Sequence, residues 1–115
     1  MHEMALTLDV VDLVATRTAG RRVSCMRLDV GELTGVVPDA LRFCFDLATG
    51  GTGLDGARLE IRLLPGQIRC RGCGATTGCA DRILLCPCGS ADVWVVQGEE
   101  LVVASVEVAK EEACA

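Results

Sequence analysis

The stretch from Cys70 to Cys88 constrains the fold of this 115-residue chain more than any other, because it contains two closely spaced pairs of cysteines. Cys70 and Cys73 form one pair, Cys86 and Cys88 form a second, and twelve residues separate the two pairs. The segment has too few hydrophobic residues to build its own core, and a bound metal ion can supply the missing stability. A glycine follows each pair and is expected to relieve backbone crowding around the sulfurs. This pattern is typical of structural zinc sites.

Four thiolates predict a closed site, since sulfur would then occupy every position around the ion and leave none for water or substrate. The second pair is irregular, because zinc knuckles usually separate paired cysteines by two residues and here only one intervenes. Either both sulfurs reach one ion in a tighter chelate, or Cys79 replaces one of them. We favour Cys70, Cys73, Cys86 and Cys88 as the zinc ligands, with Cys79 as the alternate ligand.

The remaining features of the chain predict a cytoplasmic protein. Its first residues lack a basic start and a long apolar run, and Asp9 and Asp12 interrupt the apolar residues that follow. In a reducing compartment, eight cysteines argue against a disulfide framework. Cys25 and Cys44 are expected to be small buried hydrophobic residues. Cys114 lies in a charged tail that we expect to be frayed.

Hydrophobic periodicity outlines an α/β fold around the cysteine segment. The expected elements are a helix over 4–19 ending before Gly20, a strand over 22–30, a helix over 37–48 with Leu41, Phe45 and Ala48 inward, and strands over 57–63 and 102–108. Leu59, Ile61 and Leu63 alternate with charged residues, which predicts one buried face for the fourth element.

The last strand is expected to return to the first sheet, so the cysteine segment becomes an insertion. We therefore predict a small mixed sheet flanked by two helices, with an inserted four-cysteine module that resembles a zinc ribbon. The predicted domains are 1–66 plus 98–115, which form the α/β domain, and 67–97, which form the zinc-binding module.

Two alternative functions are less well supported by the sequence. A zinc ribbon can serve as a nucleic-acid or protein interaction module, but a net charge of −5 and few aromatic residues oppose contact with phosphate backbones and stacking on bases. The spacing of Cys70 and Cys73 also serves thiol redox enzymes, in which Arg71 could stabilise a thiolate. The presence of a second cysteine pair favours a metal site instead.

The only histidine of the chain is His2, which lies between Met1 and Glu3. A terminal amine, an imidazole and the backbone nitrogens between them can close fused chelate rings on one ion. Nitrogen ligands in a tetragonal arrangement suit Ni(II) or Cu(II). The opening tripeptide is therefore a candidate metal site.

Several motifs along the chain together resemble the HypA/HybF family of nickel chaperones for hydrogenase maturation. They are Met1-His2-Glu3-Met4-Ala5-Leu6, Val30-Gly31-Glu32-Leu33, Leu41-Arg42-Phe43-Cys44-Phe45, the Cys70 to Cys73 pair, Cys86-Pro87 with Cys88-Gly89-Ser90, Glu99-Glu100-Leu101 and Val106-Glu107-Val108. Members of that family commonly carry one more residue between Cys86 and Cys88.

The resemblance implies a carrier protein rather than an enzyme. It implies that Met1, His2 and Glu3 bind transferable Ni(II) and that the four paired cysteines hold structural Zn(II). The implied partners are the maturation GTPase HypB, the large subunit of a [NiFe]-hydrogenase and, where urease is present, urease maturation proteins. Neither nucleic acid nor membrane is expected as a partner.

Overall fold

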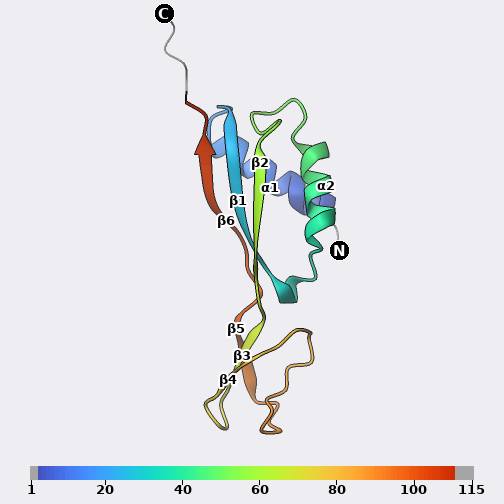
Figure 1. The fold of residues 1–115 in the computed structure, drawn as a ribbon, viewed down its shortest axis with the longest axis vertical. Helices are drawn as coiled ribbons and strands as arrows, with labels where there is room; N and C mark the ends of the chain where they lie inside the picture. The colour runs from blue at the N-terminus through green and yellow to red at the C-terminus, as the bar shows by residue number, and fades with distance from the viewer. Residues whose placement is uncertain (1–2, 111–115) are drawn as a thin grey trace, which may run out of the picture. The chain divides into compact units, whose positions relative to one another are not determined.

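The computed structural model describes residues 3–110, which form two α-helices, a short 3-10 helix and six strands (Figure 1). In chain order these are α1 (Glu3–Arg17), β1 (Val23–Gly31), the 3-10 helix η1 (Glu32–Thr34), α2 (Pro38–Ala48), β2 (Arg58–Leu64), β3 (Gln67–Cys70), β4 (Thr76–Gly78), β5 (Val93–Gln97) and β6 (Leu101–Val108). Within the described part of the chain, no helix is long and apolar enough to cross a membrane.

The chain forms two compact units. Among the described residues, the first comprises 3–28, Val37–Ile61 and 103–110, and the second comprises Asp29–Val36 and Arg62–Val102. One three-stranded sheet has the order β2-β1-β6, and another has the order β4-β3-β5. The strand that follows the cysteine segment, β6, thus returns to the sheet of β1, as the sequence predicts.

Helices α1 and α2 pack against each other in the first unit. Val11 and Val14 of α1 and Phe45 of α2 are buried there, together with Met26 and Leu28 of β1. Pro38 lies in the first turn of α2, and Asp39 follows it. Proline is tolerated there because a backbone N–H at this position would have no partner within the helix. The acid is favourable because it lies near the positive end of the helix dipole. The core is therefore built by helical and strand residues at the expected spacing.

Helix α1 ends at Arg17, two residues before its predicted end. The backbone N–H of Thr18 still donates to the carbonyl of Val14, at 2.9 Å. Ala19 then takes a left-handed conformation with φ 54°, and Gly20 follows with φ 73°. The glycine signal was correctly interpreted, but the helical hydrogen bonds stop earlier because the reversal already begins at Ala19.

The expectation of one continuously buried face on β2 is only partly confirmed. Leu59 is buried, but Leu63 is exposed over 55% of its surface. Leu63 belongs to the second unit, in which the described residues form no α-helix that could cover it. The exposed face of β2 carries charged partners for β1 instead: Glu60 accepts from Arg27 at 2.6 Å, in the first unit.

The second unit contains the antiparallel sheet that carries the metal-ligand candidates. In it, β3 pairs with β4 on one side and with β5 on the other. Burial alternates along β3, so that Ile68 and Cys70 are buried while Arg69 is exposed. Cys70 thus ends a strand with its side chain on the buried face. The predicted α/β class, with two helices, small sheets and an inserted four-cysteine module, is confirmed.

Candidate metal centre

Two tight turns present the paired cysteines. In the first turn, Cys70 closes β3, and its carbonyl accepts a hydrogen bond from the backbone N–H of Gly74 at 2.9 Å. In the second turn, the backbone N–H of Gly89 donates to the carbonyl of Cys86 at 2.8 Å. The first turn joins β3 to β4, and the second precedes β5. Each pair is therefore held by local backbone hydrogen bonds.

The glycines after the two pairs have a different role from the one expected. Gly74 and Gly89 have φ values of +75° and +96°, in the left-handed region. A Cβ built at either position would meet no atom within 4 Å, so crowding around the sulfurs does not require glycine. The backbone conformation requires it instead, because a side chain strains a residue at such φ values.

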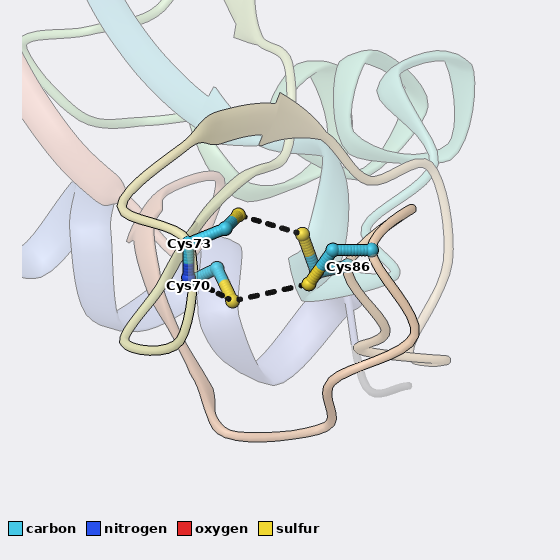
Figure 2. Close-up of side chains that lie close together, drawn as sticks. Cys70, Cys73 and Cys86 are labelled. Carbon is cyan, nitrogen blue, oxygen red and sulfur yellow. Dashed lines mark hydrogen bonds between the residues drawn. The ribbon is translucent and has the colours of Figure 1, made fainter.

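The two turns bring four sulfur atoms into one cluster. Figure 2 shows the side chains of Cys70 and Cys73 opposite the side chain of Cys86. The Sγ atoms of Cys70 and Cys88 are 3.7 Å apart, and those of Cys73 and Cys86 are 3.6 Å apart. All four Sγ atoms lie within 4.8 Å of one another. One intervening residue between Cys86 and Cys88 therefore suffices to bring both sulfurs to the cluster.

The spacing of the sulfurs fits a tetrahedral zinc ion. With Zn–S bonds of about 2.3 Å, neighbouring sulfurs of a tetrahedral site lie about 3.8 Å apart. The two measured contacts, 3.7 Å and 3.6 Å, are close to that separation. Four soft thiolates are also the donor set that structural zinc prefers. The cluster is thus suitable for zinc in both geometry and chemistry.

The acidity of the cysteines shows why a cation suits this cluster. The backbone N–H of Cys73 donates to the Sγ of Cys70 at 3.5 Å, and this contact is the largest of several hydrogen bonds that together lower the pKa of Cys70 to about 6 despite its burial. The backbone N–H of Cys88 acts in the same direction on Cys86, but burial and the neighbouring thiols outweigh it and raise the pKa of Cys86 to about 12. One thiol therefore ionises readily, while another keeps its proton until a cation stabilises its thiolate.

The other cysteines lie outside the cluster. The Sγ of Cys79 donates to the carbonyl of Asp81 at 2.7 Å, and Cys79 does not belong to the four-sulfur group. Cys25 is buried, as expected, whereas Cys44 is only half-buried. All of these described cysteines are free thiols. Cys114 falls outside the described residues.

Arg71 lies between the two cysteines of the first pair but is engaged elsewhere. Its Nε lies 3.2 Å from the Oδ1 of Asp92, and its guanidinium stacks over the ring of Trp94 at 4.6 Å. A redox site that used Arg71 to stabilise a thiolate would need the guanidinium at the sulfurs. Sequence reasoning missed this stack, because it depends on the register of β3 with β5, and the sequence around Trp94 does not alternate between polar and apolar residues.

The predicted nickel site falls mainly outside the described part of the chain. Met1 and His2 lie outside the described residues, and Glu3 is the first residue of α1. The hydroxyl of Thr7 donates to the backbone carbonyl of Glu3 at 2.6 Å. Glu3 also borders a hollow whose other walls include Met4, Leu8 and Phe43. The first residue of α1 thus lies beside an apolar surface.

Comparison with known proteins gives the family that the sequence motifs indicate, over nearly the whole chain. Residues 1–108 match the family model described as "Hydrogenase/urease nickel incorporation, metallochaperone, hypA". The hydrogenase maturation factor HypA of a Nostoc species is 42% identical over 114 residues, which cover 99% of each chain. The factor of the same name from Geobacter metallireducens is 45% identical, over 94% of this chain and 99% of the relative.

A solved structure gives the same fold at lower sequence identity. The solution structure of the Ni metallochaperone HypA from Helicobacter pylori matches with a TM-score of 0.66 and 19% identity, covering 96% of this chain and 100% of that one. The resemblance that the sequence motifs indicate is therefore confirmed. The chain belongs to the HypA family of metallochaperones for hydrogenase and urease nickel incorporation.

Proposed function

We propose that this chain binds Ni(II) at Met1, His2 and Glu3 and delivers it to the precursor of a [NiFe]-hydrogenase. The observation that carries the proposal is the family match over residues 1–108, because it includes the opening tripeptide. The ligand chemistry supports it as well, since an amine, an imidazole and backbone nitrogens favour a tetragonal Ni(II) site.

The proposal assigns the transferable nickel ion and the structural zinc ion to different sites. Residues 1–66 and 98–115 form the nickel-binding domain, and residues 67–97 form the zinc module. A chain terminus can change its ligands as a partner docks, so it can release its ion. A four-thiolate site has no open position, and Cys70 and Cys86 are almost completely buried, so the zinc held there is structural. Cys79 is only the alternate ligand in this proposal, since its Sγ donates to the carbonyl of Asp81 and lies outside the four-sulfur group.

The partners in this proposal are the GTPase HypB, the hydrogenase large subunit and, where urease is made, urease maturation proteins. The chain acts as a carrier and not as a catalyst, because its sites bind ions that are passed on or kept. We place nickel delivery in the cytoplasm, since a reducing compartment keeps free thiols available for zinc.

The replacement His2→Ala tests the nickel site. Removing the imidazole should abolish tight nickel binding in equilibrium dialysis, because the terminal chelate loses a ligand that no neighbouring residue supplies. Zinc content should not change, since the cysteines are untouched. Asp9→Asn is the matched control, because Asp9 is an exposed residue of α1 outside the tripeptide. Wild-type nickel affinity in His2→Ala would refute the proposed ligand set.

A further inference from the structure

The β4-β3-β5 sheet carries exposed side chains that the metal centre does not use. We call Arg69, Arg71, Trp94 and Val96 the arginine–tryptophan face. Arg69 stands directly opposite Trp94 in the pairing of β3 with β5. Arg69 is exposed while its neighbours in β3 are buried, so it lies on the face of the sheet turned away from the buried Ile68.

This face is held by contacts among its own residues and is partly apolar. The guanidinium of Arg71 stacks over Trp94 and is held by Asp92, whose backbone carbonyl also accepts from the backbone N–H of Arg71 at 2.9 Å. Trp94 keeps 37% of its surface exposed, and Val96, two residues on, keeps 46%. Tryptophan and arginine are the residues that contribute most to protein interfaces, above all when they are ordered before binding.

The face also carries positive charge that is not neutralised within the described residues. Arg69 forms no ion pair there, whereas the charge of Arg71 is offset by Asp92. Residues 67–97 contain three arginines and two acidic residues, while the rest of the chain contains eight basic and fourteen acidic residues. The face therefore has one arginine charge in excess, within a segment of net charge +1 on an otherwise acidic protein.

We propose that the arginine–tryptophan face binds an acidic segment of a partner protein. A carboxylate would accept hydrogen bonds from Arg69, and an apolar side chain of the same segment would cover Trp94 and Val96. A nucleic acid fits less well, because the net charge of −5 repels phosphates and the face offers only two arginines. This inference does not depend on the nickel site, so either can fail alone.

Selection from a random peptide display library tests the proposal on the full-length, zinc-loaded protein. We expect the selected peptides to be rich in aspartate and glutamate. Trp94 is the only tryptophan of the chain, so its fluorescence reports directly on occupation of the face. Arg69→Gln should weaken binding of a selected peptide by about tenfold or more, because a charge-assisted hydrogen bond is lost. Higher salt should weaken it further.

Arg22→Gln is the matched control, because Arg22 is an exposed arginine of the other compact unit. It should leave peptide affinity unchanged. Zinc content measured on each variant confirms that the module stays folded. Selected peptides without acidic enrichment, or acidic peptides that bind Arg69→Gln as well as wild type, would overturn the proposal. A single-stranded oligonucleotide that quenches Trp94 and requires Arg69 would overturn it in favour of nucleic acid.

Discussion

Cys70 is the side chain on which the zinc module should depend most. It is almost completely buried, and its sulfur lies 3.7 Å from that of Cys88. We predict that Cys70→Ser lowers zinc stoichiometry well below one per chain and loosens only the module, because metal binding and folding of such a segment are coupled. Elemental analysis with hydrogen exchange measures both effects. Cys79→Ser should keep full zinc, because the Sγ of Cys79 donates to the carbonyl of Asp81 instead. Loss of zinc in this variant would mean that Cys79 is a ligand.

The opposite pKa shifts of Cys70 and Cys86 predict that zinc binding is linked to pH. At pH 7 the metal-free cluster holds the proton of Cys86, because its pKa is raised to about 12, whereas Cys70 has a pKa of about 6 and is mostly ionised. Zinc needs thiolates, so its binding should release protons, and its affinity should rise with pH. Zinc titrations in two buffers of different ionisation enthalpy should give different heats. Identical heats would contradict the prediction.

The sequence predicted the grouping of the four cysteines but not their detailed surroundings. The short spacings bring the two sulfurs of each pair together on a local turn, and the pairing of β3 with β5 brings the two turns together. The engagement of Arg71 by Asp92 and Trp94 depends on the register of β3 with β5, which spacing along the chain does not reveal. The role of Gly89 also required backbone angles, since crowding and left-handed geometry favour the same residue type.

Helix α2 contains a natural pair of residues for measuring what its buried side contributes. Phe45 is 2% exposed and Phe43, two positions earlier, is 66% exposed. Phe45→Ala should reduce the free energy of unfolding by about 3–5 kcal/mol, because it removes a buried ring and leaves a cavity. Phe43→Ala should change it by less than about 0.5 kcal/mol. Chemical denaturation measures both, and equal losses would mean that the assigned orientation of α2 is wrong.

The regular elements were predictable where one face of an element is buried throughout. Helix α2 begins at Pro38 and buries Leu41 and Phe45, as its sequence pattern indicates. The pattern failed at Leu63, which alternates correctly but belongs to the second unit, whose described residues form no α-helix. Local periodicity identifies the side of an element that could be buried. Whether another element covers it depends on the tertiary arrangement.

The molecule as a whole combines a protein scaffold, a cluster suited to structural zinc and an opening tripeptide proposed to bind the cargo. The four cysteines that suit zinc all lie in the second compact unit, whereas α1, which begins at Glu3, lies in the first. In the proposed function, the zinc site stays closed while the nickel site exchanges its ion. The account therefore requires that nickel binding depend on the free amine of Met1 and not on the cysteines.

Calorimetric nickel titration of the tag-free protein, beside a form extended by a few residues before Met1, tests this requirement most directly. The extension converts the terminal amine to an amide and leaves every described side chain in place. Loss of a direct ligand should weaken nickel binding by more than about 100-fold, since loss of an outer-sphere partner alone costs about 10–100-fold. Zinc content should stay the same in both forms. Equal nickel affinity in the two forms would contradict the terminal chelate.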